Sequence, residues 1–235
     1  MIMITGASDN HFNTLINMIN SFINYNEKNY LIVYNLGLSE NNWNDLKNKF
    51  NGYKFITYKT FDYSKYPEWF NINIEAGHYA WKPTIIYETS LEYINEIIVW
   101  MDAGNLIKNN LFELENFIIN NFIYSAISSG DINKWTHPST IAYLKCSWLN
   151  LINRNGACLG FNTKIDSVKK FLYEFYNYSQ IKECIAPDGS SRKNHRQDQA
   201  VFTILFYKYL SQNNINYNHQ YGMQYIGYTI HNDVE

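Results

Sequence analysis

The clearest sequence feature that could carry chemistry is a single carboxylate that directly follows an apolar segment. The apolar run Ile97–Met101 stops abruptly at Asp102, which is followed by Ala103, Gly104 and Asn105. A carboxylate directly after a buried strand is held rigidly, so it is well suited to bind Mn²⁺ or Mg²⁺. The bound ion can then bridge the carboxylate to a phosphate group. The small residues let the backbone approach a ligand closely. The competing interpretation is that Asp102 merely caps a turn.

Other charged side chains stand at predicted helix starts or in a loop, where they are candidates for chemistry. Lys82 follows Trp81 and either neutralises a phosphate or is an ordinary solvated lysine. Asp198 is either a catalytic or ligand-binding carboxylate or the N-cap of its helix. Asp131 and His137 flank a tryptophan and could meet a second substrate, although loop packing explains such aromatic segments as well.

The first half of the chain predicts a scaffold that gathers strand ends at one edge. Apolar runs predict strands over residues 1–5, 30–35, 54–58 and 96–101, and helical spacing predicts helices over 12–23, 39–50 and the stretch after Pro83. Strands alternating with helices indicate an α/β fold with a mostly parallel sheet covered on both faces. Ligands bind outside the carboxyl ends of such strands, where Gly6–Asn10 and Asp102–Asn105 both lie.

The second half continues the pattern with fewer strands. Helices are predicted over 111–121, 167–178 and 198–210, strands over 122–127 and 157–161, and a strand with a tail within 217–235. Residues 62–77 and 187–196 are predicted to be loops. Because no internal repeat and no linker interrupts the chain, residues 1–235 are predicted to form a single domain.

Composition narrows the classes of partner. With a net charge of −2 and a pI of about 6.3, the chain has no broad cationic field for nucleic acid or an anionic membrane. Three cysteines without metal-binding spacing favour a reducing compartment. No secretory leader pattern and no apolar stretch of about 20 residues is found, so we expect a cytoplasmic protein. Abundant Asn, Ile, Tyr and Lys with sparse Arg indicate an AT-rich genome, either viral or low-GC bacterial.

The run around Asp102 resembles the D-x-D element of GT-A-fold glycosyltransferases, and further segments occur in the order expected of that family. Thr5–His11 looks like the first strand and the loop around the nucleotide base, and Tyr34–Gly37 looks like the strand end beside the ribose. His78–Pro83 is similar to a donor-side segment. Asn155–Asn162 looks like the strand that lines the transferred sugar, and Asp198-Gln199 looks like the Asp-Gln that opens the next helix. Together they cover nearly the whole chain.

The resemblance implies a single GT-A-like, Rossmann-like domain, with a nucleotide-donor half over residues 1–105 and a sugar and acceptor half over 106–235. It implies transfer of a sugar from a nucleotide-sugar donor, with a UDP-sugar favoured, to a hydroxyl of a glycan, protein or lipid-linked precursor. A divalent metal, Mn²⁺ or Mg²⁺, would assist the departure of the nucleoside diphosphate.

The resemblance also assigns roles to individual residues. Asp102 and Asp198 would be catalytic; Thr5, Gly6, Ala7, Ser8, Asn10, Asn35, Lys82, Ala103 and Gly104 would bind the donor nucleotide; and Asn105, Asp131, His137, Asn155, Gly156 and Gln199 would bind the sugar or acceptor. Gly104 stands where the family has a second acidic residue, so only Asp102 supplies a carboxylate. His231, or less readily His219, would complete the metal site together with Asp102.

Two rival interpretations remain open. Thr5–Ser8 after the first strand suggests a nicotinamide-dependent reductase, but the further glycines that a dinucleotide turn needs are absent. The Tyr178…Lys182 spacing, typical of short-chain reductases, is expected by chance in so tyrosine-rich a chain. The missing second acidic residue supports the other rival, a degenerate GT-A-like module that binds a nucleotide or glycan without turnover. The oligomeric state stays open.

Overall fold

The computed structural model describes residues 1–26, 28–216 and 225–230. Its main sheet has six strands in the order β3-β2-β1-β4-β7-β6, and β5 and β8 form a separate two-stranded sheet. The strands are β1 (Ile2–Ser8), β2 (Tyr30–Gly37), β3 (Ile56–Thr60), β4 (Ile97–Met101), β5 (Asn105–Ile107), β6 (Ile123–Asp131), β7 (Ile152–Asn162) and β8 (Tyr228–Ile230).

The main sheet is mostly parallel, which confirms the predicted fold class. Strand β1 pairs in parallel with β2 and β4, and β2 pairs in parallel with β3. Strand β7 is the one strand of the main sheet with the opposite direction, so its pairings with β4 and β6 are both antiparallel. All five residues of β4 are buried, as expected for a central strand covered on both faces.

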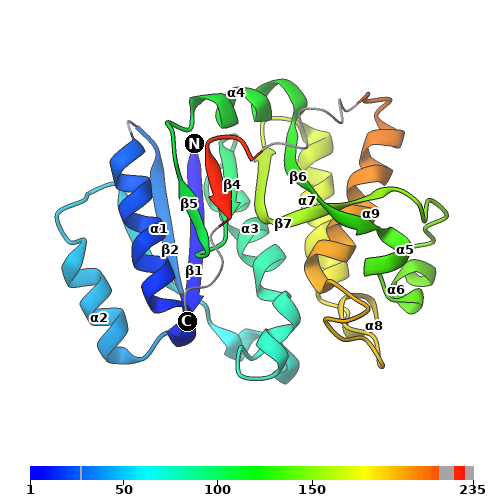
Figure 1. The fold of residues 1–235 in the computed structure, drawn as a ribbon, viewed down its shortest axis with the longest axis horizontal. Helices are drawn as coiled ribbons and strands as arrows, with labels where there is room; N and C mark the ends of the chain where they lie inside the picture. The colour runs from blue at the N-terminus through cyan, green and yellow to red at the C-terminus, as the bar shows by residue number, and fades with distance from the viewer. Residues whose placement is uncertain (27, 217–224, 231–235) are drawn as a thin grey trace.

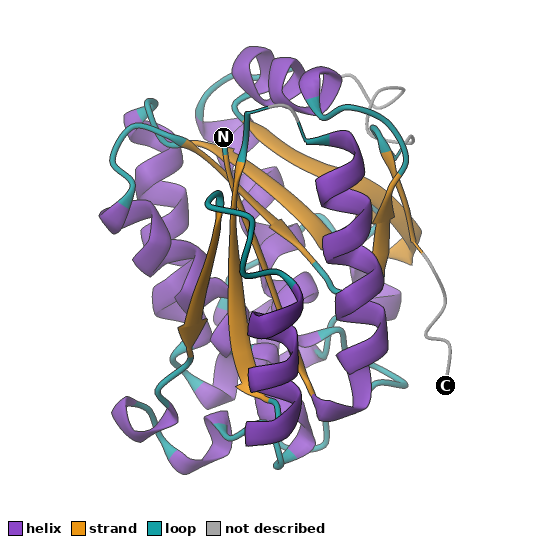
Figure 2. Cartoon of the chain, turned by 90° about the vertical axis from the view of Figure 1, so that its left-hand side faces the viewer, coloured by secondary structure: helices purple, strands orange, loops and turns teal. Residues whose placement is uncertain are grey.

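Helices cover both faces of this sheet (Figures 1 and 2). In Figure 1, α1 and α4 lie in front with the β5–β8 sheet, and α3, α7 and α9 lie behind, where α7 packs against both α3 and α9. The longer helices are α1 (Phe12–Tyr25), α2 (Glu40–Lys49), α3 (Trp81–Glu92), α4 (Phe112–Asn121), α7 (Asp166–Ser179) and α9 (Gln197–Gln212); the short ones are α5 (Ile132–Trp135), α6 (Pro138–Tyr143) and α8 (Lys182–Ile185).

Most predicted elements are found with shifted ends. Ser39 caps α2 as predicted, its hydroxyl accepting from the Asn42 N–H. Helix α3 begins at Trp81 rather than after Pro83, because proline is tolerated in the first turn, where its missing N–H needs no partner. The strand predicted over 157–161 extends back to Ile152. Of the predicted terminal strand, Tyr228–Ile230 forms β8, and residues 217–224 and 231–235 lie outside the described residues.

The segment before α3 has an unusual backbone. Glu75–Tyr79, of which residues 75–77 are predicted to be loop, forms the short turn η4, in which five consecutive residues have φ between 47° and 59°. This left-handed conformation costs L-residues other than glycine about 1–2 kcal/mol each. At Gly77, a Cβ would lie 2.2 Å from the carbonyl oxygen of Phe70, so no larger residue fits there without movement. The turn delivers the chain directly to the first residues of α3.

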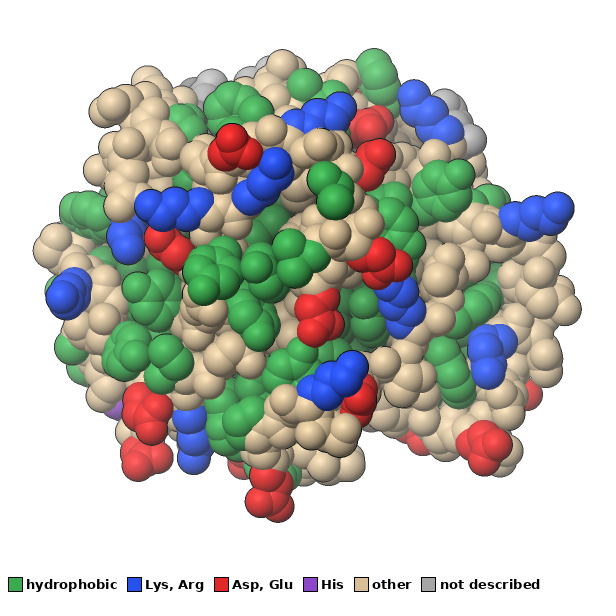
Figure 3. All heavy atoms as spheres, turned by 180° about the vertical axis from the view of Figure 1, so that it is seen from behind, with side chains coloured by type: hydrophobic (Ala, Val, Ile, Leu, Met, Phe, Trp, Pro, Cys, Tyr) green, Lys and Arg blue, Asp and Glu red, His purple; other side chains and the backbone are tan. Residues whose placement is uncertain are grey.

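The outer surface of the molecule mixes charges of both signs. On the face seen in Figure 3, Lys and Arg side chains are interspersed with Asp and Glu among hydrophobic patches, so no single-sign field covers that face. Within the described part of the chain, no helix has the length and apolar character needed to cross a bilayer.

Candidate functional site

A cavity of about 1230 Å³ opens at the carboxyl ends of the central strands. The loop after β1 and the end of β2 form one side of it, and the turn after β4 forms its floor. The starts of α3 and α9 and the middle of β7 form the other side. The cavity therefore lies where a ligand site is expected in an α/β sheet of this kind.

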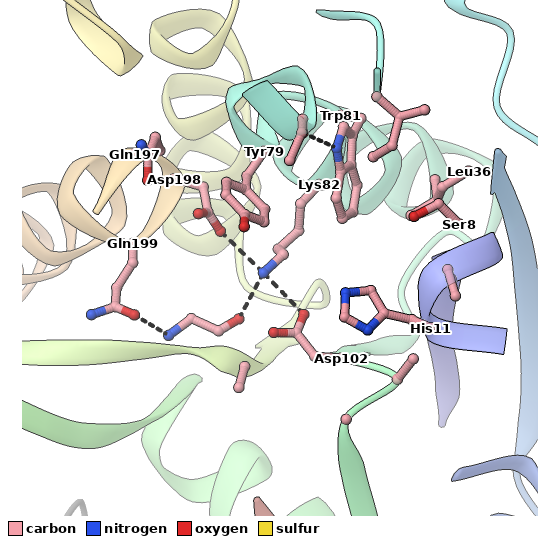
Figure 4. A pocket seen from close by; sticks show the side chains of 18 of the residues that line it. Ser8, His11, Leu36, Tyr79, Trp81, Lys82, Asp102, Gln197, Asp198 and Gln199 are labelled. Atoms are coloured by element: carbon pink, nitrogen blue, oxygen red, sulfur yellow. Dashed lines mark hydrogen bonds and ion pairs between the residues drawn. The ribbon is translucent and has the colours of Figure 1, made fainter. Parts of the chain in front are cut away.

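At the centre of the cavity, one lysine ammonium joins two carboxylates (Figure 4). Lys82 Nζ lies 3.0 Å from Asp102 Oδ1 and 3.2 Å from Asp198 Oδ2, and it donates a hydrogen bond of 3.2 Å to the carbonyl oxygen of Gly156. The three hydrogens of the ammonium thus have three oxygen partners. The contacts join the start of α3 to the turn after β4, to β7 and to α9.

Burial and charge act in opposite directions on this cluster. Burial lowers the pKa of Lys82, but the charges of Asp102 and Asp198 outweigh burial and raise that pKa above its ordinary value, so the ammonium stays charged. Burial raises the pKa of Asp198, and the charge of Lys82 opposes the rise. The side chain of Asp198 is only 7% exposed, whereas that of Asp102 is 37% exposed, so Asp102 is the more accessible carboxylate.

The Asp102 carboxylate is fixed from two sides. The indole N–H of Trp100, in β4, donates to Asp102 Oδ1 at 2.5 Å. The backbone N–H of Asp102 donates to the carbonyl oxygen of Ala157 in β7 at 2.8 Å. Because Oδ1 is occupied by Lys82 and Trp100, Oδ2 is the oxygen of Asp102 left for a ligand.

Two buried oxygen acceptors in the cavity have capacity to spare. Asp198 Oδ2 accepts no well-aligned hydrogen bond within the described chain, and its contact is the Lys82 ammonium. Asn105 Oδ1 has no hydrogen-bond partner there, while the Nδ2 of the same side chain donates to the carbonyl oxygen of Ala157. An unpaired buried acceptor is costly, which makes Asn105 Oδ1 a candidate for contact with a ligand hydroxyl or cation, and Asp198 Oδ2 can accept from a ligand in addition to Lys82.

Gly156 lets β7 approach α9 closely. A Cβ at this position would lie 3.3 Å from Cβ of Gln199 and 3.4 Å from Asp198 Oδ2. The Gly156 N–H donates to Gln199 Oε1 at 3.3 Å, and Asn155, beside it, also lines the cavity. A side chain at position 156 would therefore press on Gln199 and would touch the carboxylate that Lys82 contacts.

The end of β1 and the turn that follows it supply the other wall of the cavity. Gly6, Ala7, Ser8 and Asn10 line it, and the Ser8 hydroxyl donates to Asn10 Oδ1. Asp9 is bound to α2 instead of capping its own turn, because its Oδ1 accepts from the Ser39 N–H and from Asn42 Nδ2.

Some predicted site residues do not reach the cavity lining. Thr5 is fully buried in β1, and the Asn35 side chain accepts from the N–H groups of Gly37 and Leu38, which shapes the end of β2. Asp131 caps α5, where it accepts from the Lys134 N–H, and His137 caps α6, where it accepts from the Ser139 N–H. Tyr178 and Lys182 are also absent from the cavity lining. His231 lies outside the described residues.

Of the predicted residues, those that the structure brings to the cavity are Gly6, Ala7, Ser8, Asn10, Lys82, Asp102, Ala103, Gly104, Asn105, Asn155, Gly156, Asp198 and Gln199. Sequence reasoning missed Arg192 and Arg196, which line the same cavity beside Trp135. The scarcity of arginine was the signal that could have found them, because the chain has only three.

The cavity offers part of a metal site. Mn²⁺ and Mg²⁺ prefer oxygen ligands, and the Asp102 carboxylate and Asn105 Oδ1 supply two. Across residues 1–26, 28–216 and 225–230, no three His, Cys, Asp or Glu side chains gather into a metal-binding group. The residues present therefore fit a divalent ion whose remaining ligands come from elsewhere, such as the phosphates of a substrate.

A buried histidine near the cavity is neutral and structural. His195 Nε2 lies 2.8 Å from the carbonyl oxygen of Ile185, to which it donates, and its Nδ1 accepts from the His137 N–H at 3.1 Å. Burial lowers the pKa of His195 to about 4. The neutral ring thereby links α8, the start of α6 and the loop before α9.

Comparisons with known proteins identify the fold. Residues 1–87 match a family described as a protein of unknown function, DUF1647. No curated protein matches the chain. Among solved structures, the galactosyltransferase LgtC, in complex with donor and acceptor sugar analogues, is similar over 98% of this chain and 87% of its own, with a TM-score of 0.60 and 16% identity.

Two more glycosyltransferases share the fold over part of their length. The bifunctional glycosyltransferase WbbM matches 88% of this chain with a TM-score of 0.60 and 16% identity, and this chain spans only 37% of WbbM. The mannosyltransferase Ktr4p of S. cerevisiae, in complex with GDP, matches 87% of this chain with a TM-score of 0.58 and 8% identity, over 65% of its own length. At these identities the likeness establishes a GT-A-like α/β fold.

Proposed function

We propose that the protein is a glycosyltransferase that moves a sugar from a nucleotide-sugar donor, with a UDP-sugar favoured, to a hydroxyl of a glycan, protein or lipid-linked acceptor. The observation that carries the proposal is the Lys82 ammonium between Asp102 and Asp198 at the centre of the cavity. The GT-A-like fold, shared with glycosyltransferases, is its second support.

In this proposal the donor lies across the carboxyl ends of β1 and β4. The segment Gly6–Asn10, at the end of β1, contacts the nucleoside, with Thr5 and Asn35 supporting that segment and the end of β2. Ala103 and Gly104 leave room for the diphosphate. Residues 1–105 thus bind the donor, and residues 106–235 supply most of the sugar and acceptor contacts.

Asp198 acts on the sugars. Its buried carboxylate has an acceptor oxygen without an aligned hydrogen bond and a pKa that burial raises, which suits orienting or deprotonating a hydroxyl. Asn155, Gly156 and Gln199 line the adjoining wall and contact the transferred sugar. Lys82 holds Asp102 and Asp198 at a fixed separation.

A divalent metal fits the charge balance of the site. With both carboxylates ionised, the Lys82 cluster carries one net negative charge, which repels a diphosphate. Asp102 and Asn105, with His231 as a further ligand, would hold Mn²⁺ or Mg²⁺ against the phosphates. When bound, the ion supplies the positive charge that stabilises the departing nucleoside diphosphate.

Replacement of Asp102 tests the proposal. We expect Asp102→Ala and the isosteric Asp102→Asn to lower sugar transfer and donor hydrolysis by about a hundredfold or more, because several kcal/mol of charge stabilisation is lost. The measurement is turnover of a panel of nucleotide sugars with and without Mn²⁺, with circular dichroism to verify folding. The control is Asp166→Asn, whose side chain is 95% exposed. Full activity in Asp102→Ala would refute the assignment.

A second candidate function is nucleotide or glycan binding without turnover. The observation in its favour is Gly104, which leaves Asp102 as the lone carboxylate of its turn. Donor binding by the unmodified protein, combined with no hydrolysis or transfer across the whole panel, would select this candidate.

A further inference from the structure

The cavity continues past Asp198 to a basic and aromatic region that the proposed chemistry does not use. Trp135, at the end of α5, and Arg192 and Arg196, in the loop before α9, line this part of the cavity. Ser128 and Ser129 of β6 line it as well. We name Trp135, Arg192 and Arg196 the arginine subsite.

Arginine is concentrated here although the chain otherwise uses lysine. Only three of its nineteen basic residues are arginines. Two of the three line the cavity, and the third, Arg154, is fully buried in β7, where it donates to the carbonyl oxygen of Ser125. Arginine differs from lysine in presenting a planar fork of N–H donors that matches a carboxylate or phosphate with two parallel hydrogen bonds.

The arrangement of the subsite leaves these donors available. The Arg196 guanidinium lies 4.0 Å from the centre of the Trp135 ring, and the Arg196 backbone N–H donates to the carbonyl oxygen of Trp135. Stacking on an aromatic face fixes the guanidinium plane and keeps its N–H edge free. Within the residues that the structure describes, neither Arg192 nor Arg196 forms an ion pair with a carboxylate.

The two guanidinium groups are close enough to affect each other. Burial lowers the pKa of Arg196, the positive charge of Arg192 lowers it further, and Tyr79 opposes the change. Two like charges beside one cavity, without a carboxylate between them, are stabilised when an anion binds.

The topology places the subsite on the acceptor side. Trp135 follows β6 at one edge of the sheet, and the segment Gly6–Asn10 comprises the end of β1 and the start of the turn after it. Strands β4 and β7 lie between β1 and β6, so Asp102, at the end of β4, stands between the segment Gly6–Asn10 and Trp135 of the arginine subsite. A group bound at the arginines is therefore separated from the donor nucleotide by the reaction centre.

We propose that the acceptor is an acidic sugar, whose carboxylate or phosphate group binds Arg192 and Arg196 beside Trp135. This inference rests on the proposed glycosyl transfer and names its acceptor class. A carboxylate on a uronic acid and a phosphate on a sugar ring present the same pair of anionic oxygens to an arginine fork.

The test compares charged with neutral acceptors of the same ring configuration. Methyl glucoside, methyl glucuronide and glucose 6-phosphate, with their galacto and manno counterparts, are offered with the donor that the protein hydrolyses fastest. We expect kcat/KM for a charged acceptor to exceed that for its neutral counterpart about tenfold to hundredfold. Comparison of the uronate acceptors with the sugar phosphates shows whether the arginine subsite prefers a carboxylate or a phosphate group. Where no member of the panel accepts a sugar, dissociation constants measured by calorimetry with UDP present replace kcat/KM.

Substitutions of the two arginines test whether they cause the preference for charged acceptors. Arg192→Gln and Arg196→Gln should each lower the charged-to-neutral ratio about tenfold, and Arg196→Lys should restore only part of it, because an ammonium keeps the charge but not the fork. Lys193→Ala, which removes a neighbouring exposed charge outside the cavity lining, should leave the ratio unchanged.

The outcomes separate this inference from the proposed function. Equal use of charged and neutral sugars, an unchanged ratio in both Gln variants, or a rise in the donor KM with an unchanged ratio would each overturn the acidic acceptor. Absence of both donor hydrolysis and sugar transfer in the unmodified protein would instead refute the glycosyltransferase. Binding of acidic sugars to such an inactive protein would retain the anion site while removing its role in transfer.

Discussion

At the scale of single residues, Lys82 is held where a lone cation would be unfavourable. It stands in the first turn of α3, and a helix N-terminus disfavours positive charge. It is also almost fully buried, which lowers its pKa. Asp102 and Asp198 reverse both effects, and Gly156 supplies the third acceptor. The cluster is therefore interdependent, because each carboxylate keeps the lysine charged and the lysine makes the buried charge of Asp198 tolerable.

Removal of the lysine charge should be costly. We expect Lys82→Met to lower the free energy of unfolding by about 3–5 kcal/mol at pH 7, because it leaves the buried carboxylate of Asp198 without a counterion. The measurement is urea unfolding. The matched control is Lys169→Met, since Lys169 pairs with Asp166 on the surface, where such pairs contribute under about 1 kcal/mol.

A double variant makes this prediction sharper. Lys82→Met combined with Asp198→Asn removes the stranded charge, so we expect it to be more stable than Lys82→Met alone. Equal losses in Lys82→Met and Lys169→Met would show that the buried cluster stabilises the fold no more than a surface ion pair does.

At the scale of elements, the sequence predicts what periodicity and turn chemistry encode. The alternation of apolar runs and amphipathic helices locates β1 to β4 and most helices, and the apolar segment before Asp102 correctly ends at Met101. The turn η4 could not be predicted, since no local preference favours five consecutive left-handed residues. Packing around Phe70 and the start of α3 must impose that conformation.

Gly77 should be the position in η4 that tolerates least change. Gly77→Ala adds a Cβ 2.2 Å from the Phe70 carbonyl oxygen at a φ of 59°, so we expect unfolding to become easier by about 2 kcal/mol or more. Because η4 leads into Lys82, activity should fall as well. Thermal unfolding measures the change, and Gly52→Ala, with no heavy atom within 4 Å of its new Cβ, should change stability by less than about 0.5 kcal/mol.

A Gly77→Ala protein as stable as Gly52→Ala would mean that η4 relaxes freely.

The arginine subsite shows a different limit of prediction. Arg192 and Arg196 lie in a polar loop without periodicity, and only the fold brings that loop beside Trp135. By contrast, Asp131 and His137, which the sequence predicts as acceptor-binding residues beside the same tryptophan, each cap the start of a neighbouring helix.

At the scale of the whole molecule, the two predicted halves share one sheet. Strand β4 of the first half pairs with β7 of the second from Ile97 to Met101, and the Lys82 cluster joins both halves at the end of that pairing. Order along the chain predicted the strands but not this pairing, because long-range antiparallel contacts leave no local signal.

Global stability should depend on pH through His195. Its pKa of about 4 lies below the ordinary 6.5, so the unfolded chain binds a proton first as pH falls. The contribution of neutral His195 to the free energy of unfolding is about 3 kcal/mol. This contribution is fully present above pH 6.5 and is lost progressively as the pH falls towards 4. Urea unfolding between pH 7 and pH 4 measures it, and His195→Asn should flatten the difference. Identical pH profiles for both proteins would contradict the assignment.

The reversed handedness of η4 has a consequence for how the protein matures. A segment that opposes the intrinsic preference of its own residues cannot form early or alone; it forms when the surrounding core closes on it. Since η4 leads directly into Lys82, an immature chain has no ammonium positioned between the carboxylates. Under the proposed function, the site for charged substrates is therefore complete only in the folded protein, and partly folded molecules have no transferase activity.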